Sequence, residues 1–216
     1  MGSHITKYVL AAVASAALLL AGQCDKKEDK TAAKKADAEA AKPLPLQAPV
    51  DITSYFVPSG WMGEDKERGK GLFALDAVYK GKPRPGSSSG LCIRLSYSGK
   101  TWAGVYWQYP DCNWGETLGR TVKGAKRVTF WAAGEKGGEV VEFKAGGSGA
   151  GFRHRDTFEV AMGPIMLKPE WEPHEISLGD SPDLSNVIGA FACTIHAGTA
   201  ADGPVVVYLD EIRFAK

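Results

Sequence analysis

Short apolar or alternating segments, separated by turn residues, fill the chain from Asp51 onward. Each segment is about as long as a β-strand, and none has the 3.6-residue period of a long amphipathic helix. The pattern therefore predicts an all-β domain, with only residues 182–187 suited to a helical turn. The predicted strands are residues 52–57, 71–79, 91–97, 103–109, 127–133, 140–145, 158–162, 174–178, 187–195 and 205–214.

Alternation within these strands divides their side chains between two faces. Apolar side chains such as Val105 and Trp107 occupy one register and are expected in the core. The other register carries aromatic and polar side chains, an unusual surface for a sheet, and this favours a binding role. These outward residues are Arg94, Trp102, Tyr106, Gln108, Trp131 and Glu142.

The first residues indicate export. Lys7 precedes the apolar run from Tyr8 to Gly22, which is too short for a typical membrane span and has the length of a signal-peptide core. We therefore expect a signal peptide at residues 1–23, with an uncleaved anchor helix as the alternative.

The sequence LAGQC, from Leu20 to Cys24, resembles a bacterial lipobox, although Gln23 stands where Gly or Ala is usual. The resemblance implies that Cys24 carries a lipid and anchors the protein to the cell envelope, on the inner or the outer membrane. Cleavage by an ordinary signal peptidase is the alternative. Residues 24–50 mix both charge signs with alanine and proline, which is typical of a flexible linker.

Composition narrows the partners. With 26 basic and 25 acidic residues, the chain has a net charge of +1 and no overall field that would attract nucleic acid. The 26 glycines and 12 prolines suit many tight turns. If Cys24 carries lipid, Cys92, Cys112 and Cys193 can form at most one internal disulfide, with Cys112 able to reach either of the others. The sequence contains no CxxC and no HExxH motif, so it does not indicate a zinc site.

Two segments, WAGVYWQYPDCNWG at 102–115 and VVVYLDEIRF at 205–214, resemble the carbohydrate-binding modules of the galactose-binding-like jelly-roll type. The chain is similar in particular to bacterial lipoproteins built around such a domain, which also tend to open with an element like WMGE at 61–64. The resemblance implies a jelly-roll β-sandwich over residues 51–216 and non-catalytic binding of a polysaccharide or glycan.

The outward residues suit that ligand. Aromatic rings pack against the C–H faces of pyranoses, and a few polar groups around them bind hydroxyls. We therefore predict a sugar-binding face, with a loop-covered structural face or a protein interface as the alternatives. Its rings are Trp102, Tyr106, Trp114 and Trp131, and its polar groups are Arg94, Gln108, Asn113 and Glu142.

Asp210 shares the register of Tyr208 and Ile212, which places a carboxylate on the apolar side of the last strand. An unpartnered buried carboxylate is costly. The jelly-roll modules that the chain resembles often hold a structural Ca²⁺ at this position, and Glu64 is the candidate second ligand. Hydrogen bonds from backbone N–H groups or from an arginine are the alternative.

The leading interpretation is thus a monomeric, envelope-anchored carbohydrate-binding lipoprotein that meets the membrane only through its N-terminal lipid. A polysaccharide-degrading hydrolase or lyase is the second, because jelly rolls also carry those activities. A structural lipoprotein whose aromatic face contacts another protein is the third.

Overall fold

The computed structural model describes residues 43–198 and 203–216. Their regular structure consists of strands and turns, and no helix among them is long and apolar enough to cross a membrane. The predicted signal peptide, Cys24 and most of the predicted linker lie outside the described residues. Strand pairing begins at Leu46, ahead of the expected domain start at Asp51.

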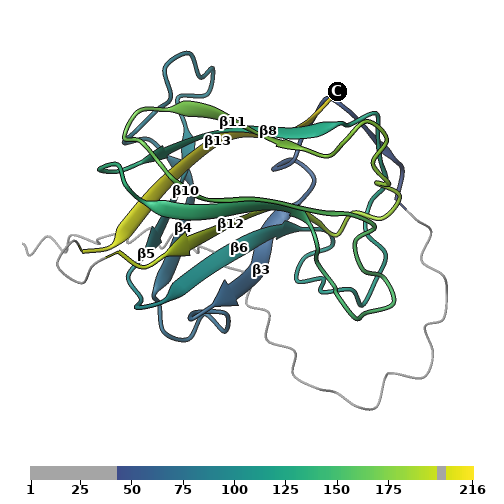
Figure 1. The fold of residues 1–216 in the computed structure, drawn as a ribbon, viewed down its shortest axis with the longest axis horizontal. Coiled ribbons are helices and arrows are strands. Elements are labelled where there is room, and N and C mark those ends of the chain that lie inside the picture. The colour runs from purple at the N-terminus through teal and green to yellow at the C-terminus, as the bar shows by residue number, and fades with distance from the viewer. Residues whose placement is uncertain (1–42, 199–202) are drawn as a thin grey trace, which may run out of the picture.

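Two antiparallel sheets stack as the layers of a sandwich (Figure 1). The five-stranded sheet has the order β10 (Glu159–Met166), β9 (Val140–Gly146), β12 (Gly189–His196), β6 (Trp102–Gln108) and β3 (Val57–Gly63). The six-stranded sheet has the order β11 (Glu172–Ser177), β8 (Arg127–Gly134), β13 (Val205–Ala215), β5 (Cys92–Tyr97) and β4 (Phe73–Tyr79), and β2 (Val50–Asp51) also pairs with β13. The short strands β1 (Leu46–Gln47) and β7 (Val122–Lys123) pair in parallel.

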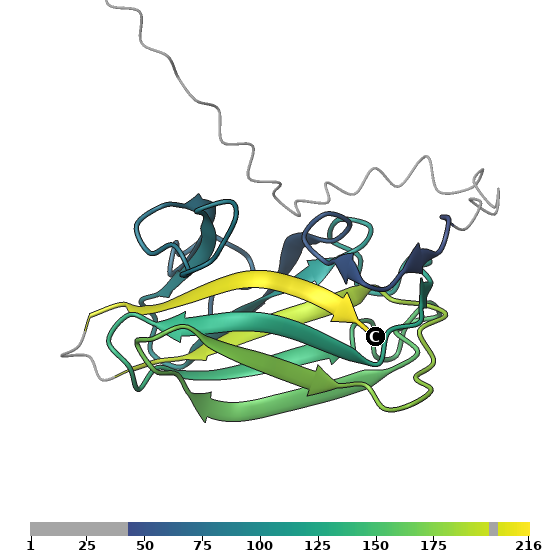
Figure 2. The ribbon, with the colours of Figure 1, turned by 90° about the horizontal axis from the view of Figure 1, so that it is seen from above.

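Neighbours along the chain repeatedly change sheet, as β5 to β6, β8 to β9 and β12 to β13 do. Such switching between two antiparallel sheets is the connectivity of a jelly roll. Figure 2 shows the long strand β13 running alongside β8 on one layer of the sandwich. The predicted all-β class and β-sandwich architecture are confirmed.

The core lies between the two sheets and uses the inward register that alternation predicts. Trp107, Phe130, Phe143 and Phe191 are each at most 1% exposed and pack as one aromatic cluster, with Phe130 and Phe143 centroids 4.5 Å apart. Burying such large rings supplies much of the hydrophobic stabilisation of the domain. The core therefore fixes which side chains of each strand are left on the outer faces.

Two local predictions are wrong. Residues 52–56 form a turn instead of a strand, because the N–H of Phe56 donates to the carbonyl of Ile52 at 2.9 Å and both side chains enter the core. The predicted helical turn at 182–187 is an irregular segment. Its Asn186 side chain binds backbone groups of neighbouring loops.

Candidate functional site

The predicted sugar-binding residues are divided between opposite sides of the sandwich. Strands β6 and β9 belong to the five-stranded sheet, whereas β5 and β8 belong to the six-stranded sheet. The structure therefore does not bring the predicted residues together into one surface. Trp102, Tyr106, Gln108 and Glu142 lie on one outer face, and Arg94 and Trp131 lie on the other.

On the five-stranded sheet, Tyr106 and Gln108 face outward as expected but are buried, contrary to the prediction of an exposed face. The Tyr106 hydroxyl donates to the carbonyl of Gly146 at 3.0 Å. The Gln108 side chain is 0% exposed and hydrogen-bonds to Ser59 and Ser148. The loops at 109–121 and 147–158 cover this part of the sheet, which matches the alternative of a loop-covered structural face.

Asn113 and Trp114 belong to the first of these loops. The amide nitrogen of Asn113 donates to the carbonyls of Tyr109 and Thr117, and its oxygen accepts the N–H groups of Gly115 and Glu116. Trp114 meets the Tyr106 ring edge-on, with centroids 6.1 Å apart. Both side chains therefore organise the loop and seal it against the sheet.

The far end of β6 stays open on this face. Trp102 is 40% exposed, and its cross-strand partner is His196. The His196 Nε2 lies 3.5 Å from the Glu142 Oε1. This leaves one accessible indole beside a small polar pair.

The outer face of the six-stranded sheet is shaped by a β-bulge in β13. Glu211 has a φ of 50°, and the pairing of β13 with β8 shifts between Asp210 and Arg213. A non-glycine residue in the left-handed region is strained, and such bulges often redirect side chains near binding sites. Here the bulge places Asp210, Glu211 and Arg213 together on the outer face, while Ile212 enters the core.

A groove of about 330 Å³ lies beside this bulge, and we name it the tryptophan groove. Its tryptophan is Trp131, which is half-buried on β8. Charged side chains that are one third to one half exposed stand around the ring. The lining residues are Thr129, Phe130, Trp131, Pro173, His174, Glu175, Glu211 and Arg213.

A second cavity of about 310 Å³, the serine hollow, shares Glu211 and Arg213 with the tryptophan groove. The hydroxyls of Ser87, Ser88, Ser89 and Thr53 line it, so it is rich in groups that both donate and accept hydrogen bonds. The two cavities therefore meet at the charged residues of the bulge.

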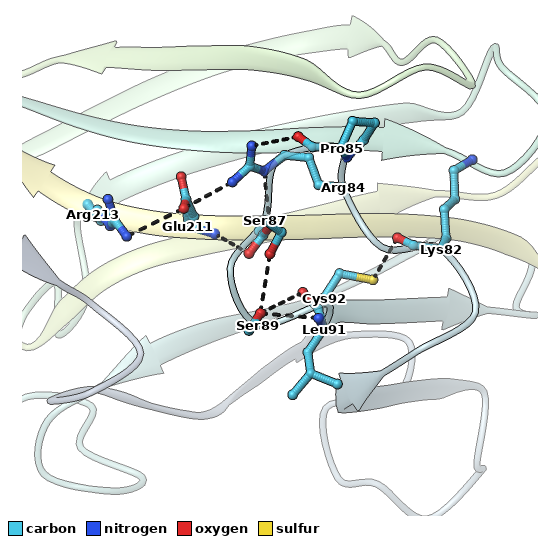
Figure 3. A network of polar contacts seen from close by, with 10 residues as sticks. Lys82, Arg84, Pro85, Ser87, Ser89, Leu91, Cys92, Glu211 and Arg213 are labelled. Atoms are coloured by element: carbon cyan, nitrogen blue, oxygen red, sulfur yellow. Dashed lines mark hydrogen bonds and ion pairs between the residues drawn. The ribbon is translucent and has the colours of Figure 1, made fainter.

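The segment 80–91 crosses the outer face and is fixed there by Arg84 (Figure 3). The Arg84 Nε lies 2.9 Å from the Asp210 Oδ2, and its Nη2 lies 3.0 Å from the Glu211 Oε1. Its guanidinium also sits over the Trp131 ring, 4.7 Å from the centroid. Trp131 lines the tryptophan groove, whereas Arg84 does not.

The expected inward position of Asp210 is wrong. The bulge breaks the alternation, so Asp210 stays outward with Tyr208, while Val207 and Leu209 point inward. Its partner is Arg84, which is the hydrogen-bonded alternative to a metal.

Glu64 belongs to a different network. Its Oε2 accepts the Tyr97 hydroxyl at 2.6 Å and the Lys100 N–H at 2.8 Å. These bonds, the Tyr97 contact first, lower the pKa of Glu64 to about 2. Asp210 and Glu64 therefore do not fit a shared calcium site, and the described residues contain no cluster of three or more metal-ligating side chains. Calcium binding stays a prediction, now without this pair of ligands.

Arg94 lies on the same outer face but lines neither cavity. Its guanidinium is 5.6 Å from the centroid of the Tyr79 ring, which stacks on Tyr208 with centroids 5.6 Å apart. Arg94 thus belongs to an aromatic cluster under the 80–91 segment.

Cys92 and Cys193 are buried free thiols, so neither pairs with Cys112. Burial raises the pKa of Cys92 to about 11, and its Sγ donates to the carbonyl of Lys82 at 3.3 Å. Both residues act as small apolar side chains.

Sequence reasoning missed Arg84, Glu175, Glu211 and Arg213. Glu211 and Arg213 could have been found, because the order LDEIR places two acids in succession and so interrupts the alternation of the last strand. Arg84 lies in a loop, and nothing local links it to residues 126 and more positions away.

No protein-family profile and no curated protein matches the chain. Among solved structures, the family 11 carbohydrate-binding module from Clostridium thermocellum, in complex with a β-1,3-1,4-mixed-linked tetrasaccharide, is 17% identical, with a TM-score of 0.42 over 72% of this chain and 88% of that one. TmCBM61, in complex with β-1,4-galactotriose, is 15% identical, with a TM-score of 0.39 over 74% and 90%. A family 30 carbohydrate-binding module is 14% identical, with a TM-score of 0.39 over 79% and 86%.

Proposed function

We propose that this protein is a non-catalytic carbohydrate-binding protein that holds a polysaccharide or glycan in the tryptophan groove. The observation that carries the proposal is the half-buried indole of Trp131 beside an open cavity of about 330 Å³ on an outer sheet face. A flat apolar ring with a few polar groups around it is the usual composition of a small-ligand site. The ring would pack against the C–H face of a sugar.

The charged residues at the groove provide the hydrogen bonds. Arg213 donates, and the carboxylates of Glu175 and Glu211 accept from sugar hydroxyls. The serine hollow continues beyond Glu211 and Arg213. A ligand of two or more sugar residues would therefore cross β13 and use both cavities.

We place this binding domain on an envelope-anchored lipoprotein. The support is the lipobox-like sequence from Leu20 to Cys24 and the linker composition that follows it. Mass spectrometry of the mature N-terminus tests the anchor, with Cys24→Ser as the variant that should become soluble. Cleavage elsewhere, with an unmodified Cys24, would count against it.

The binding proposal is tested with the full chain on a glycan array, with and without Ca²⁺, and then by affinity electrophoresis on the retained sugar. Trp131→Ala should weaken retention by about 1–2 kcal/mol, the scale of a lost aromatic contact. Arg213→Gln, at a side chain that is 47% exposed, should also weaken it while leaving the fold intact. Trp102→Ala, on the opposite face, is the matched control and should bind as the wild type does.

The same experiment separates the alternatives. Release of shortened sugars would select the hydrolase or lyase. Loss of retention with Trp102→Ala but not with Trp131→Ala would move the site to the five-stranded sheet. A chain that retains no sugar would leave the protein-interaction function.

A further inference from the structure

A third cavity, of about 670 Å³, lies over the loop that carries the sequence FRHRD and shares no residue with the tryptophan groove. We name it the arginine cavity. Three consecutive residues that can carry positive charge, Arg153, His154 and Arg155, stand in its wall. The complete lining is Leu118, Phe152, Arg153, His154, Arg155, Asp156, Thr157, Asp183 and Asn186.

The loop is held in place by two buried polar side chains. The amide nitrogen of Asn186 donates to the carbonyls of His154 and Arg155, both at 2.9 Å, so the backbone between the two arginines is fixed. The carboxylate of Asp156 accepts the N–H groups of Ser148, Ile188 and Gly189. Asn186 and Asp156 are each 7% exposed. The cationic residues therefore sit on a backbone that is already ordered, which lowers the entropy cost of binding.

The charge of the cavity is slightly positive near neutral pH, because its two arginines outweigh Asp183 and a partly protonated Asp156. Arg153 and Arg155 are exposed, and among residues 43–198 and 203–216 neither guanidinium forms an ion pair with a carboxylate. The two acids of the lining are engaged elsewhere, Asp156 by backbone amides and Asp183 by the N–H of Ser185. Burial also raises the pKa of Asp156 to about 7, which reduces its negative charge near neutral pH.

The apolar ring in the arginine cavity and the small number of its cationic residues indicate which class of ligand it binds. Phe152 is 51% exposed beside the arginines and offers an apolar ring for a sugar. Membrane surfaces are recognised by clusters of about 4–8 basic residues, and duplex nucleic acid by roughly 6–10 phosphate contacts, which two arginines and one histidine do not provide. Arginine binds carboxylate and sulfate groups through paired N–H donors.

We propose that the arginine cavity is a second ligand site, which takes an acidic glycan through a carboxylate or sulfate group bound by Arg153 and Arg155. The site is built from residues outside the tryptophan groove and does not depend on the function proposed for that groove. An acidic sugar would place its charged group between the two arginines and its ring on Phe152.

The test measures binding of a heparin-derived tetrasaccharide and an oligogalacturonate tetramer to the full chain by calorimetry, with maltotetraose as the neutral comparison. At least one acidic sugar should bind and maltotetraose should bind more weakly. Arg153→Gln/Arg155→Gln should reduce the affinity about tenfold or more, because charge-assisted bonds are lost. Lys123→Gln/Lys126→Gln removes two exposed charges elsewhere and should change the affinity by less than about twofold.

An equal loss of affinity in the two double variants would overturn the proposal. So would no binding of either acidic sugar, or binding of phosphatidylglycerol vesicles without binding of acidic sugars. The variant Trp131→Ala separates the two sites. It should retain the acidic sugar even if it loses the neutral one, and an equal loss of both would place the acidic sugar in the tryptophan groove.

Discussion

The outer face of the five-stranded sheet and that of the six-stranded sheet are both crossed by loops, but different bonds hold these loops. Over the five-stranded sheet, uncharged groups and one carboxylate bind backbone amides and carbonyls, as Tyr106, Asn113 and Asp156 do, and Gln108 binds two serine hydroxyls. Over the six-stranded sheet, Arg84 fixes the 80–91 segment through two carboxylates of β13.

The difference bears on where a ligand can enter. Buried bonds to the backbone require close packing, so they seal Tyr106 and Gln108 from solvent. Ion pairs between long side chains span a greater distance and leave space beside them. The tryptophan groove and the serine hollow both open next to Glu211 and Arg213. The five-stranded face is thus closed over Tyr106 and Gln108, whereas the six-stranded face carries two cavities beside β13.

The largest expected effect tests the assignment of β6 to the two sides of its sheet. Trp107→Ala should lower the free energy of unfolding by about 3–5 kcal/mol, because it opens a hole in the aromatic core. Trp102→Ala should change it by less than about 1 kcal/mol, since that ring is 40% exposed. Urea denaturation measures both, and a reversed order would mean that the faces of β6 are exchanged.

The next prediction concerns the ion pair between Arg84 and Asp210 on the six-stranded face. Asp210→Asn should lower the free energy of unfolding by roughly 2–4 kcal/mol, because it removes one of two carboxylate partners from Arg84, which is only 8% exposed. The other partner, Glu211, remains and limits the loss. Asp180→Asn, at a fully exposed side chain, is the control and should have no measurable effect. If Asp210→Asn is equally silent, the pair does not fix the 80–91 segment.

On the five-stranded face, the carboxylate of Asp156 has the role that the Arg84 ion pair has on the other face, because it holds loops through hydrogen bonds. Asp156→Asn should lower the free energy of unfolding by about 1–3 kcal/mol, because the new amide group meets backbone N–H donors and leaves one unsatisfied. Hydrogen exchange at Ser148, Ile188 and Gly189 should accelerate. Unchanged exchange would show that the loops are sealed by packing alone.

The same variant has a pH signature. Burial raises the pKa of Asp156 from its ordinary 3.8 to about 7 in the folded protein. Protonation of Asp156 therefore stabilises the folded protein. This contribution to the free energy of unfolding is fully present below pH 3.8 and is lost as the pH rises through 7. Asp156→Asn should lack this decline. The difference in free energy of unfolding between the wild type and Asp156→Asn should therefore narrow toward pH 8. A gap that widens with pH would mean that the ionised carboxylate is the stabilising form.

Sequence alone predicted the sandwich because alternation reports which side chains enter the core, as it did for Val105 and Trp107. It failed where a single residue changes the register, since the bulge at Glu211 turns Ile212 inward while Asp210 stays outward with Tyr208. It also could not assign strands to sheets, so Trp102 and Trp131 were expected on one surface. Burial of Gln108 depends on loops that are distant in sequence, which no local pattern reveals.

The smallest expected effect concerns neither outer face but a tie between the two sheets. Glu64 follows β3 of one sheet and accepts the hydroxyl of Tyr97 from β5 of the other. This bond and the N–H of Lys100 lower the pKa of Glu64 from 4.5 to about 2. The lowered pKa means that the stabilisation is present above pH 4.5 and is lost as the pH falls through 2.

Glu64→Gln should therefore flatten the decline in thermal midpoint between pH 5 and pH 2, while the variant melts slightly below the wild type at neutral pH. Tyr97→Phe removes the first donor and should flatten the decline in part, because the Lys100 N–H remains. Both variants should bind sugar as the wild type does, since neither residue lines the groove. A Glu64→Gln protein with the full acid sensitivity of the wild type would show that other carboxylates carry the acid response, and that the two sheets are joined by their core alone.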